Sequence, residues 1–421
     1  MTRIVQTMTL AVLIWAPVRP LLAQPAPSAD GCVACHADLA EPLAAPAQLF
    51  ADDIHAASGF SCVDCHGGDP ATSDRAAAKD PATGYRGVPT GPAVVETCAR
   101  CHGDADFMRR FAPTQRVDQA AEYAVSGHGR RLAEGDTSVA TCTSCHGPHG
   151  IRRVSDAQSP VFPLRVADTC GACHTDPSHM AGHDLGGVPF PTDQLAAYET
   201  SAHFEALTVG NDLSAPTCND CHGSHGATPP GVDAVVNVCG TCHAAFAARY
   251  EQSTHAFIFE QGCAQCHDHH AIKAADDAML APGSSTCDGC HGEGETGLAV
   301  ARTMSASIEG LKAALAQTGS LVERARTAGM EMSEQEVALR EARNQLTLAR
   351  TEVHTFDPAA VTQVVDEGLA QLAAIDRAGL AAMVELRYRR LGLAVSVGLI
   401  LLFVVALYFK VRELDRRLPP G

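Results

Sequence analysis

The sequence predicts a mainly α-helical protein with extensive loops, followed by an antiparallel helical bundle and one C-terminal transmembrane helix. Three observations lead to this prediction. All 18 cysteines fall inside one repeated five-residue motif. Residues 30–295 are rich in Gly, Pro, Cys and His, whereas residues 296–390 are rich in Ala, Leu, Glu and Arg with few helix breakers. Residues 391–409 contain no charged side chain.

The repeated motif is the pentad Cys-x-x-Cys-His, which occurs nine times and leaves no cysteine over. Two thiols at this spacing reach the two vinyl groups of one haem, and the adjacent imidazole becomes the proximal ligand of its iron. We therefore expect nine covalently attached haem c groups. Zinc also binds cysteine pairs, but it does not require a histidine after every second cysteine. The predicted attachment sites are Cys32, Cys35, Cys62, Cys65, Cys98, Cys101, Cys142, Cys145, Cys170, Cys173, Cys218, Cys221, Cys239, Cys242, Cys263, Cys266, Cys287 and Cys290. The predicted proximal ligands are His36, His66, His102, His146, His174, His222, His243, His267 and His291.

Residues 1–23 have the pattern of a secretory signal peptide. Arg3 supplies the positive charge, Met8 to Ala16 form an apolar run, and Ala23 follows as a small residue near a cleavage site. The run is too short to span a bilayer. Because bacteria attach haem c outside the cytoplasm, we expect the bulk of the chain in the periplasm.

Residues 30–295 are expected to form a nonahaem cytochrome c domain with a haem core. Only 5% of all residues are aromatic, and stacked porphyrins would supply the apolar mass that side chains do not. The domain divides into one leading pentad, at Cys32, and four two-haem units. Each unit has the order histidine, pentad, pentad, and the four leading histidines are His55, His128, His203 and His255.

These motifs resemble the doubled-pentad multihaem cytochromes c. That superfamily includes NapC/NirT-like quinol dehydrogenases, small periplasmic multihaem carriers, and pentahaem and octahaem reductases. The resemblance covers residues 32–291. It implies closely stacked haems, mostly with two histidine ligands each. It also implies that the histidine beside or before a pentad often ligates a neighbouring haem.

Eleven histidines remain after the nine proximal ones, so the supply of distal ligands meets the demand. Seven are placed by the repeat and are predicted distal ligands: His55, His128, His149, His203, His225, His255 and His270. One of His179 and His183 is the expected eighth, and we select His183. For the ninth we select His354, with His269 and Met108 as open alternatives.

Residues 296–390 predict three helices that pack as a bundle or stalk. The first carries an apolar stripe from Val300 to Val322 and ends at Gly329. A capping box, Ser333 to Glu336, opens the second, and Asp357 with Pro358 opens the third. If the third helix continues to residue 391, its start lies roughly 50 Å above the membrane surface, at about 1.5 Å per residue.

Residues 391–409 are long enough for one transmembrane helix, which leaves a short cytoplasmic tail at residues 410–421. Basic residues flank the span on both sides, so their distribution favours this orientation only weakly. Export and haem attachment place everything before residue 391 outside. The predicted location is the bacterial inner membrane.

Two histidines on each iron leave no position for substrate, so the sequence favours electron transfer over catalysis. We expect a carrier between a membrane redox partner or the quinol pool and periplasmic acceptors. One alternative is a multihaem oxidoreductase that acts on a small nitrogen or sulfur compound at one open haem. Another is a scaffold whose bundle assembles a larger complex. A net charge of −17 argues against a nucleic-acid partner, and the oligomeric state is left open.

Overall fold

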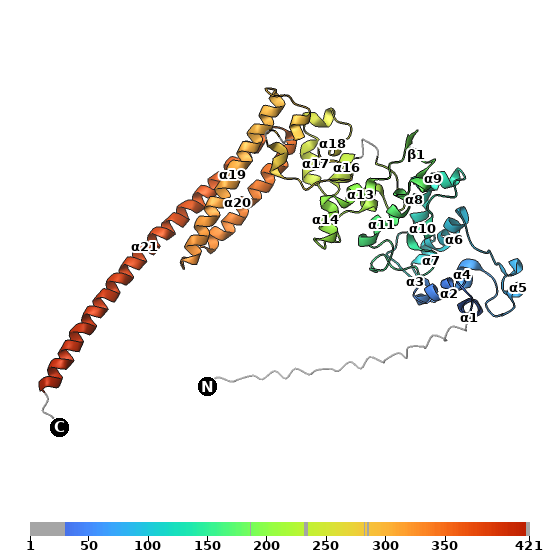
Figure 1. The fold of residues 1–421 in the computed structure, drawn as a ribbon, viewed down its shortest axis with the longest axis horizontal. Coiled ribbons are helices and arrows are strands. Elements are labelled where there is room, and N and C mark those ends of the chain that lie inside the picture. The colour runs from blue at the N-terminus through green and yellow to red at the C-terminus, as the bar shows by residue number, and fades with distance from the viewer. Residues whose placement is uncertain (1–29, 186, 231–234, 282, 284–285, 418–421) are drawn as a thin grey trace, which may run out of the picture. The chain divides into compact units, whose positions relative to one another are not determined.

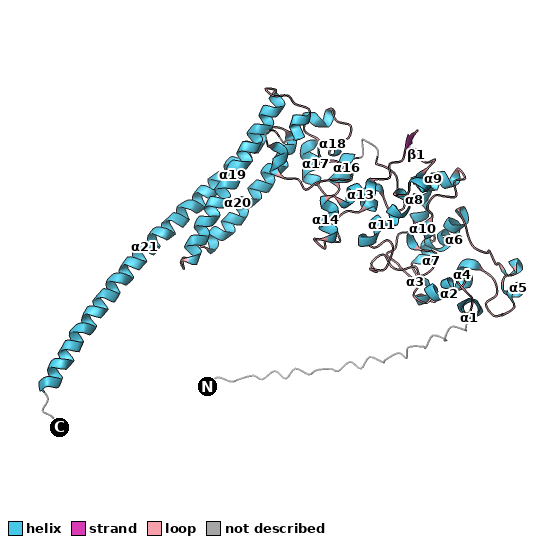
Figure 2. Cartoon of the chain, in the orientation of Figure 1, coloured by secondary structure: helices cyan, strands magenta, loops and turns pink. Residues whose placement is uncertain are grey.

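The computed structural model describes residues 30–185, 187–230, 235–281, 283 and 286–417. The predicted signal peptide, residues 1–23, lies outside this range. Helices joined by loops make up nearly all of the described chain (Figures 1 and 2). The one sheet in this part pairs two antiparallel two-residue strands, β1 (Asp184–Leu185) and β2 (Val188–Pro189). The chain forms two compact units, residues 1–162 and 163–421.

The first unit consists of short helices and long loops. Few of its large apolar side chains are buried, among them Val94, Met108 and Leu132. Such a thin apolar core is what a protein wrapped around flat prosthetic groups requires. Its elements are α1 (Gly31–Ala37), α2 (Ala45–Phe50), α3 (Ile54–Ala57), α4 (Cys62–His66), α5 (Arg75–Ala78), η1 (Pro81–Thr83), α6 (Pro92–His102), α7 (Ala105–Met108), α8 (Gln119–Val125), α9 (Gly127–Ala133) and α10 (Cys142–His146).

The second unit begins with a region of the same character and ends with the long helices. Its short elements are α11 (Pro163–His174), α12 (Pro177–Met180), the two strands, α13 (Gln194–Glu199), α14 (Ala202–Thr208), α15 (Cys218–His222), α16 (Val235–Gly240), α17 (Ala244–Tyr250), η3 (Thr254–Phe257), α18 (Ala264–His267), η4 (Asp277–Leu280) and η5 (Thr286–Gly289). The long elements are α19 (Thr296–Thr327), α20 (Ser333–Glu352) and α21 (Pro358–Arg417), with η6 (Val353–Thr355) before α21.

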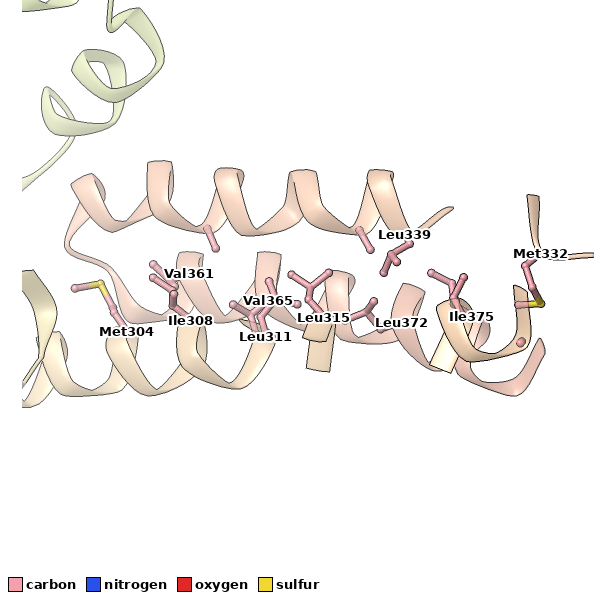
Figure 3. Close-up of a cluster of buried hydrophobic side chains, with 14 of the residues drawn as sticks. Met304, Ile308, Leu311, Leu315, Met332, Leu339, Val361, Val365, Leu372 and Ile375 are labelled. Carbon is pink, nitrogen blue, oxygen red and sulfur yellow. The ribbon is translucent and has the colours of Figure 1, made fainter. Parts of the chain in front are cut away.

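Helices α19, α20 and α21 pack side by side, which confirms the predicted antiparallel bundle (Figure 1). Apolar residues at helical spacing form its core, and Ile308, Leu311 and Val361 are fully buried. Figure 3 shows these side chains meeting between the three helices, with Leu339 and Leu372 further along the seam. The bundle is thus the main side-chain core of the second unit.

Two of the three helix-end signals predicted for the bundle agree with the structure. Gly329, with φ 84°, follows α19 in the left-handed conformation expected of a C-terminal glycine. Asp357 Oδ1 accepts a hydrogen bond from Ala359 N at 2.9 Å as α21 begins. The predicted capping box is wrong. Ser333 is the first helical residue after Met332, and its backbone N donates to Glu331 Oε1 instead. Met332 is only 3% exposed, so burial of this side chain in the core, rather than capping chemistry, sets the turn.

Helix α21 runs without a break for 60 residues, from the bundle into the apolar segment. Residues 391–409 are exposed throughout. In the described part of the chain, α21 alone is long and apolar enough to cross a membrane, and none of its most apolar stretch is buried.

Ion pairs at two places join the bundle to the preceding region of the second unit. Asp277 of η4 is 12% exposed and lies 2.8 Å from both Lys312 of α19 and Arg350 of α20. Arg249 of α17 donates to Glu352 at the end of α20 at 2.6 Å. Both places lie at the end of the bundle from which α21 starts.

We expect Leu311→Ala to destabilise the bundle by about 2–5 kcal/mol, because it removes a fully buried side chain and leaves a cavity. Thermal unfolding followed by circular dichroism measures the loss. Leu348→Ala is the matched control, because Leu348 is 49% exposed in the same bundle. Equal effects of the two substitutions would contradict the packing described.

Asp277→Asn should weaken the attachment of the bundle by about 1–3 kcal/mol at neutral pH, since it removes charge-assisted hydrogen bonds. The hydrogen bond from Arg350 lowers the pKa of Asp277 to about 2. Because the pKa of Asp277 is lower in the folded state than the unfolded value near 4, its ion pair stabilises the folded state fully above about pH 4. This stabilisation is lost as the pH falls through about 2. The difference in melting temperature between wild type and variant should therefore shrink between pH 4 and pH 2. A constant difference would count against the ion pair.

Candidate haem sites

The first pentad of each of the first three two-haem units forms a five-residue helix, namely α4, α10 and α15. One helical turn brings the two cysteines, three positions apart, to the same face. The preceding residue, Ser61, Thr141 or Thr217, caps each helix. A glycine with positive φ follows each proximal histidine, at Gly67, Gly147 and Gly223. At Gly67 a Cβ would lie 1.9 Å from Gly84 O, so only glycine fits the turn.

The second pentads lie at or near the ends of other helices, and the leading histidines start short ones. Helices α6 and α11 end on proximal histidines, at His102 and His174. The leading histidines lie at the first turns of α3, α9, α14 and η3. Each of these turns is capped by the residue two positions before the histidine.

Six pentad histidines each face a histidine from outside the pentads. The ring centres of each pair are 5.9–6.3 Å apart. The pairs are His102 with His55, His66 with His149, His243 with His203, His222 with His270, His291 with His255, and His267 with His354.

This separation fits one iron between two imidazoles. A metal–nitrogen bond of about 2 Å on each side, with each ring centre about 1.2 Å behind its nitrogen, predicts roughly 6.4 Å between ring centres. Two directly packed rings would not require that gap. The residues therefore fit haem c, with the pentad cysteines positioned for attachment and a histidine on each side of the iron.

The pairs follow a regular rule along the chain. A leading histidine faces the second pentad of its own unit, as His55 faces His102. The first pentad of a unit faces a histidine from the following unit, as His66 faces His149 and His222 faces His270. No further unit follows His267, and the bundle supplies His354 in its place.

The His354 ring is held in place by the bundle and by one aromatic contact. Its Nδ1 lies 3.2 Å from Thr351 O, and Phe246 packs edge-on against the ring at 5.1 Å. The two alternatives for this role are placed differently. His269 has a side chain that is 71% exposed, and Met108 is buried in α7 of the first unit.

The other predicted ligands remain predictions. His128 is half-buried on α9, and His225 lies in the loop after α15. His179 and His183 lie beside one another, with ring centres 6.2 Å apart. The remaining pentad histidines are His36, His146 and His174.

Several histidines are oriented by a bond at the ring nitrogen that faces away from the proposed iron. Nδ1 lies 2.9 Å from Leu43 O in His36, 2.8 Å from Gly87 O in His66 and 3.2 Å from Thr228 O in His222. Donation of the Nδ1 proton to a carbonyl leaves Nε2 as the unprotonated nitrogen. Nε2 is then available to bind metal.

Burial favours the neutral form in six of the facing imidazoles by lowering their pKa. They are His149, His203, His255, His267, His270 and His354. The neutral ring is the form that ligates a metal. The burial of these rings thus favours iron binding.

The pairs fall into two classes by the angle between their rings. His55 with His102 and His255 with His291 are nearly perpendicular, at 84° and 87°. The other four pairs lie between 21° and 26°. Perpendicular axial ligands give a strongly anisotropic electron paramagnetic resonance (EPR) signal and near-parallel ligands a rhombic one, so spectroscopy can separate the two classes.

Consecutive pentads lie next to one another within each compact unit. The side chains of Cys98 and Cys142 lie next to each other in the first unit. Those of Cys239 and Cys263 do so in the second unit, as do those of Cys170 and Cys218. Each contact joins the first cysteines of successive pentads, so the haems they attach would be neighbours.

Sequence reasoning did not identify the structural role of two tyrosines in the repeat, Tyr123 and Tyr198. Tyr123 OH donates to Ala140 O at 2.8 Å, and Tyr198 OH donates to Pro216 O at 3.0 Å. Each acceptor lies two residues before the first cysteine of a pentad. These hydroxyls therefore fix the pentad helices. The signal that could have indicated this role is a tyrosine that recurs five residues before three leading histidines, at Tyr123, Tyr198 and Tyr250.

The comparisons with known proteins agree with this geometry. The model of the cytochrome c3 family matches residues 54–175. The multiheme cytochrome MtrA of Shewanella baltica (strain OS185) is 25% identical over 197 residues, which cover 39% of this chain and 56% of that protein. These two matches support a multihaem cytochrome c family for the chain. The chain spans about half the length of that relative. No solved structure matches it.

If His354 ligates a haem iron, we expect His354→Ala to remove one axial ligand and convert one low-spin haem to a high-spin one. Optical and EPR spectra of the purified protein measure the change. His269→Ala is the control, because that side chain is largely exposed. An unchanged low-spin spectrum in the His354 variant would remove the bundle as a source of ligand.

Proposed function

We propose that this multihaem cytochrome is a membrane-anchored periplasmic carrier with nine haems that relays electrons to or from redox proteins. The observation that carries the proposal is the set of six facing histidine pairs. A haem with two histidine ligands exchanges one electron and offers no position to a substrate. Nine pentads support the count of nine.

The contacts between successive pentads support a relay rather than isolated redox sites. Cys98 with Cys142 and Cys239 with Cys263 bring neighbouring attachment points together. An electron entering at one end of such a row can pass along it. The polypeptide holds the row rigid through capped helices and bound tyrosines, so little reorganisation accompanies each transfer.

The long helix supports a membrane anchor. Residues 391–409 would cross the bilayer, with residues 410–421 on the cytoplasmic side and the haems on the periplasmic side. The segment at residues 1–23 would direct export. The sequence pattern predicts both the membrane span and the export signal, and the exposed apolar surface of α21 supports the membrane span.

The length of α21 bears on the partner. His354 precedes Pro358, and the 33 residues from there to the span rise roughly 50 Å at about 1.5 Å per residue. The site of His267 and His354 is therefore far from the bilayer core. This distance favours a redox protein above the membrane over quinol within it as the partner of that site. The acidic chain, with net charge −17, would suit a basic docking face.

The test uses the full chain matured in a host that attaches haem c. Intact mass should show nine haems on a chain that lacks its signal peptide, and cell fractionation should place it in the membrane. A variant ending at residue 390 should keep its haems and become soluble. A soluble redox protein should reduce both forms at similar rates. Substantially fewer haems, or a strong high-spin signal in the wild type, would contradict the carrier and favour the oxidoreductase.

A further inference from the structure

One buried position recurs two residues before each leading histidine. It is occupied by Asp53 in the first two-haem unit and by Ser126, Ser201 and Ser253 in the other three. All four side chains are at most 3% exposed. Each caps the helical turn that carries the histidine. The first unit thus has a carboxylate where the others have a hydroxyl.

The serines use their side chains for capping. Ser201 Oγ accepts from Phe204 N at 3.1 Å, and Ser253 Oγ accepts from Ala256 N at 3.3 Å. A hydroxyl at this position does not bond to the histidine ring in either of these two turns. The capping role alone does not require an acid.

Asp53 does more than cap its helix. Its Oδ1 accepts from the backbone N of His55 at 2.8 Å and lies 2.9 Å from His55 Nδ1. Its Oδ2 accepts from Ile151 N at 2.8 Å. A buried carboxylate is therefore aimed at the ring nitrogen opposite the one that faces His102.

His255 is the opposite case among the leading histidines. Its Nδ1 is buried and has no hydrogen-bond partner within the described part of the chain. Phe259 stacks on the ring with centres 5.4 Å apart, and Phe356 lies 4.0 Å away. The facing ring, His291, has Glu295 at 3.6 Å, beyond hydrogen-bond distance, and that carboxylate is 61% exposed.

We propose that Asp53 holds the reduction potential of the haem bound by His55 and His102 below that of the haem bound by His255 and His291. The proposal rests on the function proposed above. Donation of the Nδ1 proton to a carboxylate makes the imidazole a stronger electron donor, which favours the oxidised iron. Reduction adds one electron from the redox partner, and the proton stays between Nδ1 and Oδ1. Asp53 is a positioning residue, because it acts through His55.

Asp53 also has a structural role that the test must separate. Through Ile151 it holds the segment that carries His149, the ring facing His66. Loss of this bond would disturb the near-parallel His66 site. The ring angles allow the two effects to be distinguished, since the perpendicular His55 pair would give a strongly anisotropic EPR signal and the near-parallel His66 pair a rhombic one.

The experiment compares three variants of the haem-loaded full chain. Asp53→Ser gives the first unit the residue found in the other three, and Asp53→Asn keeps the shape without the charge. Ser253→Asp places a carboxylate two residues before His255. Haem content by mass is checked first, and the midpoint of each strongly anisotropic EPR signal is then measured by redox titration.

Asp53→Ser should raise the midpoint potential of one strongly anisotropic signal by ~59 mV. For one electron this corresponds to about a tenfold change in the equilibrium constant for reduction. Asp53→Asn should raise this midpoint by less, and Ser253→Asp should lower the midpoint of a different strongly anisotropic signal. Ser253→Asp should leave every rhombic midpoint unchanged, and in Asp53→Ser the His66 site is the one rhombic site of the described pairs that should respond, because its bond through Ile151 is lost.

Unchanged anisotropic midpoints in a protein that carries all nine haems would overturn the proposal and leave the carrier function intact. A shift confined to the rhombic signals would assign Asp53 a structural role only. If both Asp53 variants fail to fold, the Ser253 variant decides, because an unshifted midpoint there also overturns the proposal. Fewer than nine haems in the wild type would instead refute the proposed function.

Discussion

The structure depends on pairs of histidine rings held about 6 Å apart across the positions where haem iron would bind. Each ring comes from a different local element, so each pair joins two parts of the chain. In the first unit His66 and His149 are 83 residues apart in sequence. Iron binding would therefore stabilise the tertiary structure of the cytochrome region, since a ligand that binds only the folded state favours that state.

The helical bundle has a second task in this arrangement. Its core of interlocked apolar side chains folds by ordinary burial, as Leu311 and Val361 illustrate. The turn between α20 and α21 then supplies His354 and Phe356 to two sites of the cytochrome region. The bundle thus contributes to the last predicted haem site and continues into α21, which is long and apolar enough to cross a membrane. A scaffold without redox function would not need an imidazole at that turn.

The sequence predicted the features that depend on local pattern. Pentads, the three long helices and the unbroken course of α21 all follow from spacing and composition. The sequence could not predict that His149 faces His66, because this pairing depends on how successive units stack. Ser333 was misread as a cap because the burial of Met332 decides that turn. The bond between Asp53 and His55 depends on a side-chain rotamer, although the replacement of a repeated serine by aspartate was visible in the repeat.

An experimental structure of the haem-loaded protein, with iron located by anomalous scattering, tests the central claim most directly. The account predicts one iron midway between the rings of each of the six pairs, including His267 and His354. An iron at His267 with water, or with any residue other than His354, as its second axial ligand would contradict the account.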